Sequence, residues 1–302
     1  MPGKSNIAWC DVTWNPTVGC CRVSSGCQNC YAFSTHDRRH NAWLAGTFPN
    51  APAQYHEPFE TIQLIHDRLD VPLRWTKPRR IFVNSVSDLF HADVPDGFIA
   101  WVWDVMARTP WHTYQILTKR PERMLDFVQR WSDLAGESSE PRLIRGPEAT
   151  RETHPSGRGQ LFAAYLDELL KASGGVQRGA WPTFDWMEGW RWWTTQPLPN
   201  VHLGVSVENQ EAAYRLDYLV QTPAAVRFVS VEPLIGPLDL GKWVVCQHHG
   251  WSRRFDDLAS CYHCGARFDA TQPHPVAIDW VIAGGESGPG YRPADLSWFQ
   301  SL

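Results

Sequence analysis

Six short apolar runs recur along the chain, and most of them are followed by polar turn residues and then by a helical pattern. Apolar residues at helical spacing predict one helix through Phe98 and Met106, and Pro121 opens another. Strands separated by helices imply parallel pairing, and continuous apolar runs suit strands that are covered on both faces. The predicted strands are Ile7–Val12, Ile81–Val86, Thr113–Thr118, Val201–Val207, Val226–Val231 and Trp280–Ala283.

This alternation predicts an α/β fold, a partial parallel (β/α)6-type barrel that forms a single domain over residues 1–302. A doubly wound open sheet is the alternative, because the number of units does not fix whether the sheet curls. Two stretches interrupt the pattern. Residues 131–199 are rich in Trp, Gly and Pro and predict an insertion or lid, and residues 242–275 predict a second, small insertion dense in Cys and His.

Composition narrows the class of protein. Of the 302 residues, 43% are hydrophobic and 20% charged, which excludes a disordered chain. The formal net charge of -4 excludes a basic surface over the whole molecule but permits a local basic groove. No apolar run approaches the ~20 residues that cross a bilayer, so we expect a cytoplasmic protein with no membrane partner. Eight cysteines kept reduced there point to metal rather than to disulfides.

Polar residues follow the predicted strands where each of them ends. Solvent contact alone makes strand ends polar, but five such ends together favour one shared site. In α/β barrels the carboxyl ends of the strands carry the active site. The residues concerned are Asn84, Ser85 and Asp88 after the second strand, Lys119 and Arg120 after the third, then Glu208, Glu232 and Glu286.

Three cysteines follow the first strand at a spacing that suits an iron–sulfur cluster. Cys27 and Cys30 are separated by two residues, and Cys20 lies seven positions before Cys27. Three thiolates on a four-iron cluster leave one iron free to bind a cofactor or substrate. Structural zinc, a redox Cys-x-x-Cys pair and inert buried thiols are the competing interpretations. Cys21 is a possible fourth ligand, although neighbouring side chains in an extended chain point apart.

A second cluster of cysteine and histidine occupies the insertion at 242–275. Two ligand pairs, each followed by glycine, predict a closed tetrahedral zinc site that would hold a short insertion without its own core. His248 is an alternative to His249, and the site is either structural or in contact with nucleic acid. The predicted zinc ligands are Cys246, His249, Cys261 and Cys264.

Several ordered blocks carry a resemblance that covers nearly the whole chain: Trp14–Ala32, Pro78–His91, Ile116–Met124, Leu203–Asn209, Arg227–Leu234 and Trp280–Gly288. On these blocks the chain resembles a phage-associated family of proteins of unknown function with a three-cysteine N terminus like that of radical S-adenosylmethionine enzymes. The commonest radical pattern has three residues between the first two cysteines, whereas this chain has six. The family pattern continues into a further strand, so we expect a chain that stops at Leu302 to be a shortened member.

The resemblance implies a [4Fe-4S] cluster on Cys20, Cys27 and Cys30, with S-adenosyl-L-methionine bound at the open iron and cleaved to a radical. A reductant protein such as a flavodoxin or ferredoxin would supply the electron, and phage association suggests a nucleic-acid base or nucleotide as substrate. By position, the candidate cofactor-binding residues are Tyr31, Asn84, Ser85, Asp88, Lys119 and Arg120. The candidate catalytic residues, which would bind ribose hydroxyls or handle protons, are Glu208, Glu232 and Glu286.

Two other function classes stay open at this point. The first is a non-catalytic, zinc-stabilised protein that binds nucleic acid, in which both cysteine clusters are structural. The second is a barrel hydrolase or lyase that uses the glutamates without a radical step. Iron content would separate the first from the radical enzyme, and activity without the N-terminal cysteines would identify the second.

Overall fold

The computed structural model of the protein describes residues 5, 7–136, 197–241, 243, 251–253, 258–261, 267–269, 278–288, 290–300 and 302. Most of the predicted insertion at 131–199, and much of the one at 242–275, lies outside these residues. Residue 131, where the first insertion was predicted to begin, lies inside helix α3 (Pro121–Gly136). Trp131 is 1% exposed and belongs to the core.

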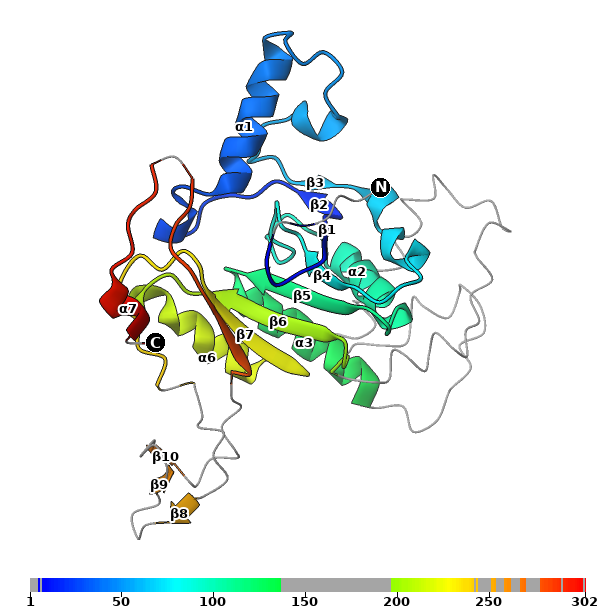
Figure 1. The fold of residues 1–302 in the computed structure, drawn as a ribbon. Helices are drawn as coiled ribbons and strands as arrows, with labels where there is room; N and C mark the ends of the chain where they lie inside the picture. Colours follow the sequence, from blue (N-terminus) through cyan, green and yellow to red (C-terminus); the bar gives the residue numbers. More distant parts are fainter. Residues whose placement is uncertain are drawn as a thin grey trace, which may run out of the picture.

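A six-stranded sheet is the central element of the fold (Figure 1). Every neighbouring pair of its strands is parallel, which confirms the predicted α/β class. The third, fifth and sixth strands have the predicted bounds. In sheet order the strands are β1 (Val12–Trp14), β4 (Arg80–Val83), β5 (Thr113–Thr118), β6 (Val201–Ser206), β7 (Val226–Val231) and β11 (Trp280–Ala283).

The six strands follow one another across the sheet in chain order. Each connection therefore moves the chain one place in the same direction. A doubly wound sheet reverses its direction at a switch point, and these six strands contain no reversal. The doubly wound alternative is therefore wrong. Strands β1 and β11 form the two edges of the sheet.

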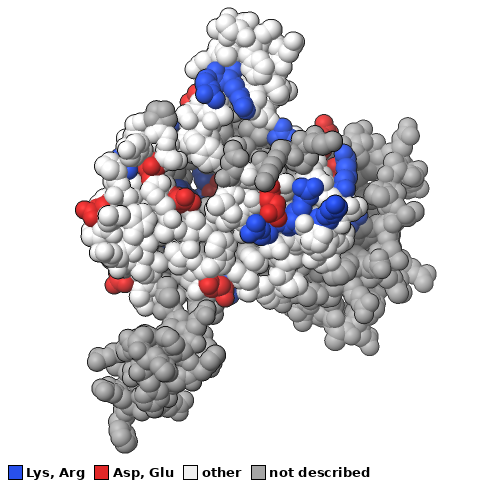
Figure 2. Space-filling model, in the orientation of Figure 1, with Lys and Arg blue, Asp and Glu red and all other residues white. Residues whose placement is uncertain are grey.

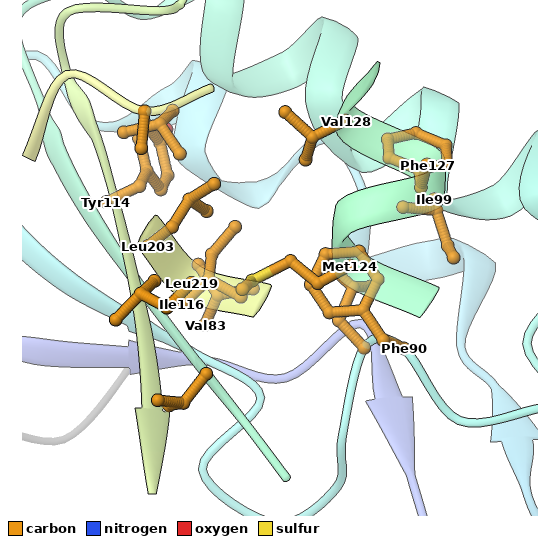
Figure 3. Close-up of a cluster of buried hydrophobic side chains, with 14 of the residues drawn as sticks. Val83, Phe90, Ile99, Tyr114, Ile116, Met124, Phe127, Val128, Leu203 and Leu219 are labelled. Carbon is orange, nitrogen blue, oxygen red and sulfur yellow. The ribbon is translucent and has the colours of Figure 1, made fainter. Parts of the chain in front are cut away.

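Three helices cover one face of the sheet: α2 (Asp96–Arg108), α3 and α6 (Tyr214–Gln221) (Figure 1). Helix α2 is apolar along nearly its whole length and is buried accordingly. Fully burying an apolar side chain of this size contributes about 1.5–3 kcal/mol. Figure 3 shows the resulting core, in which the labelled residues are Val83, Phe90, Ile99, Tyr114, Ile116, Met124, Phe127, Val128, Leu203 and Leu219.

Four aromatic rings show that the sheet is curved. The Trp9 ring centroid lies 4.6 Å from that of Phe82 in β4, 6.3 Å from that of Phe228 in β7 and 6.5 Å from that of Trp280 in β11. In a flat sheet, three strand spacings would put β4 and β7 roughly 14 Å apart. One indole therefore touches all three strands because the sheet wraps around it. Gly204 in β6 makes room, since a Cβ there would stand 2.5 Å from the Phe228 ring.

The remaining elements lie outside this sheet. Helix α1 (Tyr31–Leu44) stands away from it and contacts η2 in the segment that follows (Figure 1). Among the described helices, none is both long and apolar enough to cross a membrane. The short elements are the antiparallel pair β2 (Thr17–Val18) and β3 (Gln63–Leu64), the antiparallel strands β8 (Trp251–Arg253), β9 (Leu258–Cys261) and β10 (Arg267–Asp269), the 3₁₀ helices η1 (Ser25–Cys27), η2 (Ala53–Tyr55), η3 (His66–Arg68), η4 (Val71–Arg74) and η5 (Gln210–Ala213), and α7 (Leu296–Gln300).

Candidate active site at the carboxyl edge of the sheet

The N-terminal cysteines lie on a loop between β2 and α1, which we call the cysteine loop (residues 19–30). Gly19 begins it with a φ of 102°, a left-handed conformation that favours glycine. A Cβ at this position would also stand 2.3 Å from the backbone oxygen of Thr61. The loop holds four free thiols that are at least partly accessible to solvent: Cys20, Cys21, Cys27 and Cys30.

One arginine joins the cysteine loop to the end of β5. Arg120 donates from Nη1 to Cys20 Sγ at 3.7 Å and from Nη2 to Cys21 Sγ at 3.1 Å. Cys21 Sγ also lies 3.0 Å from His91 Nε2. The Asp93 amide donates to His91 Nδ1, so the proton of the neutral ring is on Nε2 and points at this sulfur. Cys21 is thus held by two basic side chains, whereas burial raises the pKa of the Cys20 thiol to about 12.

Asp88 orients this arginine. Its Oδ2 accepts a hydrogen bond from Arg120 Nη1 at 2.8 Å and one from the Lys119 amide at 3.1 Å. Its Oδ1 accepts from Thr118 Oγ1 at 2.7 Å and from the Phe90 amide at 3.0 Å. Four donors therefore occupy the carboxylate. Asp88 links the segment after β4 to the end of β5. Its carboxylate oxygens are engaged in these hydrogen bonds rather than free to bind a ligand.

Glu208, after β6, holds the middle of the cysteine loop. Its Oε2 accepts from Arg215 Nη1 at 2.9 Å, and the two side chains are 2% and 3% exposed. Its Oε1 accepts from the Gly26 amide at 3.3 Å, and a Cβ on Gly26 would lie 2.9 Å from the Glu208 carboxyl carbon. Burial by itself would raise the pKa of Glu208, but Lys119, Ser24 and Arg215 outweigh it and lower that pKa. Glu208 is therefore an ionised group in a fixed position.

Glu286, after β11, belongs to a clasp that closes over the same loop. Its Oε2 accepts from Arg292 Nε at 2.9 Å and from Asn29 Nδ2 at 2.8 Å. Arg292 also donates to the Ser25 backbone oxygen at 3.0 Å and to Gln28 Oε1 at 3.2 Å. Hydrogen bonds from Arg292 lower the pKa of Glu286 to about 2. We call these five residues the clasp; it ties the segment after β11 to the cysteine loop.

The clasp predicts a pH dependence. The lowered pKa of Glu286 means that its contribution to stability is full above the ordinary carboxyl pKa near 4.5 and is lost as the pH falls towards 2. The variant Glu286→Gln cannot make this contribution at any pH. We expect its melting temperature to lie below that of the wild type at pH 6 and the difference to shrink between pH 4.5 and pH 2. A constant difference over this range would contradict the assignment.

Glu232 differs from the other two glutamates. Because Ser206 and Ser230 are partners in register, Glu232 occupies on β7 the place that Glu208 occupies on β6. No hydrogen bond or ion pair reaches its carboxylate from the described residues, and burial raises its pKa. A Cβ on Gly284 would stand 2.5 Å from Glu232 Oε1, so the carboxyl lies against bare backbone. Two neighbouring carboxyls whose pKa values move in opposite directions are typical of sites that handle protons.

Asn84 is a second group without partners among the described residues. It follows β4 with a φ of 61° and is 3% exposed, and no described residue forms a hydrogen bond with its side-chain amide nitrogen or oxygen. An unsatisfied buried polar group costs about 1–3 kcal/mol, which a bound ligand can recover. Next to it, Ser85 donates to Asn15 Oδ1 at 3.1 Å and accepts from the Tyr31 hydroxyl on its backbone oxygen. Burial raises the pKa of Tyr31 to about 12.

Lys119 is a half-buried cation that interacts electrostatically with Glu208 and Cys27. Burial lowers the pKa of its amine, while the charges of Glu208 and Cys27 act in the opposite direction. The charge of Cys27 also acts on Cys20. Thiols from both ends of the cysteine loop, an amine and a carboxylate therefore share one environment at the carboxyl edge of the sheet.

The arrangement of these thiols bears on the kind of metal that they could hold. Within the described residues, no three His, Cys, Asp or Glu side chains converge on the position of a single ion. A closed zinc site would need such convergence, whereas the cysteines of a four-iron cluster each bind a different iron and stand farther apart. Cys20, Cys27 and Cys30 are free thiols that are at least partly accessible to solvent, which is the donor set that a cluster needs. Of the predicted zinc ligands, Cys246, His249 and Cys264 lie outside the described residues, and only the place of Cys261 in β9 is described.

Three functional residues were missed by the sequence analysis: His91, Arg215 and Arg292. Arg215 carried a usable signal, because it lies beside Leu216 and Leu219 on the buried side of α6 and an arginine there needs an internal partner. His91 and Arg292 carried none, since each lies in a loop whose path the local sequence does not fix.

Neither a curated protein nor a solved structure matches the chain. One family model matches residues 4–302, which is nearly the whole chain. The protein therefore belongs to the family described as "Protein of unknown function (DUF5131)".

Proposed function

We propose that this protein is a cytoplasmic radical S-adenosylmethionine-type enzyme that acts on a nucleic-acid base or nucleotide. Cys20, Cys27 and Cys30 would hold its [4Fe-4S] cluster. One observation carries the proposal: free, accessible thiols stand on a loop at the carboxyl edge of a parallel sheet, where side chains from four strand ends hold that loop. Those side chains are Asp88 (through Arg120), Arg120, Glu208 and Glu286.

The finer description of the fold belongs to the same proposal. We infer that the curved sheet is a partial (β/α)6-type barrel, because its strands lie in chain order and wrap around Trp9. Barrels of this kind carry their active sites at the carboxyl edge. The insertion at 242–275 would be a zinc-ribbon-like unit that binds Zn²⁺, and β8–β10 would be its strands.

Once bound, the cluster and S-adenosyl-L-methionine would together supply one-electron chemistry and a radical, with a flavodoxin or ferredoxin as the electron donor. The chain's own residues divide the remaining work. The unpartnered amide of Asn84 offers a donor and an acceptor to the cofactor, and Lys119 offers a cation to its carboxylate. Glu232 is the glutamate free to take or hold a proton. Glu208 and Glu286 position the cysteine loop.

The experiment is reconstitution of the full chain with iron and sulfide without oxygen, followed by EPR of the reduced protein. A four-iron signal is expected, and it should shift when S-adenosylmethionine is added. Cys27→Ala should lose the signal. Asn84→Ala should keep the cluster but weaken the cofactor-dependent shift, because the amide that meets the cofactor is gone.

Cys21→Ser is the matched control, because Cys21 lies on the same loop but its sulfur contacts Arg120 and His91. It should retain the cluster signal. A chain that binds no iron and fills with zinc would overturn the radical enzyme in favour of the zinc-stabilised nucleic-acid-binding protein. A cluster that survives in Cys27→Ala would overturn the ligand assignment.

A further inference from the structure

A rigid aromatic surface lies at the edge of the sheet opposite to the cysteine loop, where β4 and β5 begin. Trp111 is 45% exposed, and its indole nitrogen donates to the Trp75 backbone oxygen at 3.0 Å. The centroid of the His112 ring lies 5.6 Å from that of Trp111 and 6.0 Å from that of Trp75, which it meets edge-on. Trp111 is therefore held in place by a buried histidine and a half-buried tryptophan rather than free to fold back on the protein.

Four cations lie in the segment around Trp75, and two of them form no ion pair with a described residue. Arg74 and Arg80 are neutralised by Asp70 and Asp11, at 2.6 Å and 3.0 Å respectively. Lys77 and Arg79 lie between them in sequence, and neither forms an ion pair with any described residue. Figure 2 shows Lys and Arg side chains gathered over this side of the molecule.

Arg79 is already arranged as a stacking group. Its guanidinium carbon lies 5.2 Å from the centre of the Trp75 ring, and its buried Nε has no hydrogen-bond partner in the part of the chain that the structure describes. A guanidinium fixed against an indole loses little freedom when it binds an anion. The surface thus offers one flat hydrophobic ring and two unpaired cations on a preformed base.

We propose that Trp111, Lys77 and Arg79 bind single-stranded nucleic acid, with an unpaired base stacked on the Trp111 ring and phosphates on the two cations. This combination of a fixed aromatic face and unpaired cations is the one that single strands need, because any unpaired base can stack and the backbone is anionic. In a duplex the bases stack on one another, so their faces are not available to the Trp111 ring. An acidic protein could bind the two cations but offers no base to stack on the ring. The site lies away from the cysteine loop, so this proposal does not rest on the proposed function.

The test is fluorescence anisotropy of a labelled single-stranded oligonucleotide of about 12 nucleotides, titrated with the full chain at low and moderate salt. Trp111→Ala should weaken binding by about 5- to 100-fold, the loss of one stacked base. The double variant Lys77→Gln with Arg79→Gln should also weaken binding. The slope of log K against log salt concentration should become less steep by roughly 1.4, because two phosphate contacts are lost. Trp111→Phe should bind more tightly than Trp111→Ala, since it restores a ring.

Arg38→Gln is the matched control, because Arg38 is an exposed cation on α1, far from this surface in the chain. It should leave binding unchanged, and unaltered melting temperatures should show that all variants fold. The proposal fails if Arg38→Gln weakens binding as much as the double variant, or if Trp111→Ala binds like the wild type. It also fails if a duplex of the same sequence binds more tightly than the single-stranded oligonucleotide. Failure here would leave the EPR result at the cysteine loop unaffected.

Discussion

Replacing Arg215 by methionine is expected to lower the free energy of unfolding by about 3–5 kcal/mol, the usual cost of removing one partner from a buried ion pair. Arg215 and Glu208 are almost completely buried, and Arg215 also donates to the Ser206 backbone oxygen at 2.7 Å. Without the guanidinium, the Glu208 carboxylate keeps its buried position but loses the charged donor to its Oε2. Urea unfolding followed by circular dichroism measures the change.

The exposed pair Arg74–Asp70 supplies the control for this prediction, with side chains 68% and 49% exposed. Arg74→Met should cost no more than about 1 kcal/mol, because water already solvates both charges. The double variant Arg215→Met with Glu208→Gln should recover part of the loss, since it removes the stranded charge. A loss in Arg215→Met as small as that in Arg74→Met would contradict the buried geometry.

Asp88→Asn is expected to loosen the start of the cysteine loop without unfolding the protein. The change removes the charge that orients Arg120, and each hydrogen bond to a charged group contributes roughly 1.5–3 kcal/mol. Arg120 in turn contacts the sulfur atoms of Cys20 and Cys21. Both thiols should therefore react faster with a maleimide in the variant, and mass spectrometry of the labelled peptides gives the two rates.

Asp93→Asn is the matched control, because Asp93 follows the same strand but its side chain is 73% exposed. Its carboxylate lies 3.7 Å from His91 Nδ1, and His91 contacts Cys21, so the control applies to Cys20. Asp93→Asn should leave the labelling rate of Cys20 near that of the wild type. Equal acceleration in the two variants would mean that general loosening of this segment, and not the orientation of Arg120, controls access to the thiols.

The fold was largely predictable from the sequence because strands buried on both faces appear as continuous apolar runs. β5, β7 and β11 have the bounds that the runs predict. The predicted bounds of the first strand were wrong: β1 runs over Val12–Trp14 rather than Ile7–Val12. The Cys10 amide bonds to the Ile7 carbonyl in a turn, and Trp9 enters the concave side of the sheet. An apolar run does not reveal whether its residues pair with a strand or fill the space that strands enclose.

The candidate site was only partly predictable for a different reason. Glu208, Glu232 and Glu286 all follow apolar strands, and the sequence assigns them the same role. Their roles separate because Arg215 on α6 neutralises the first and Arg292 neutralises the third, while the second has no such partner among the described residues. These partners come from tertiary packing, which the pattern around each glutamate does not record.

The clasp has a consequence for how the protein is made. Asn29 and Glu286 are 257 positions apart, so the ribosome synthesises the thiols long before the residues that hold them. At about 5–20 residues per second, the interval is roughly 13–50 s. During this time the nascent cysteines lack their clasp, and Glu208 and Arg215 are also still to come for most of it. Insertion of the proposed cluster into a completed loop would therefore follow the synthesis of Arg292, and growth conditions that supply iron and sulfide late in expression should raise the loaded fraction.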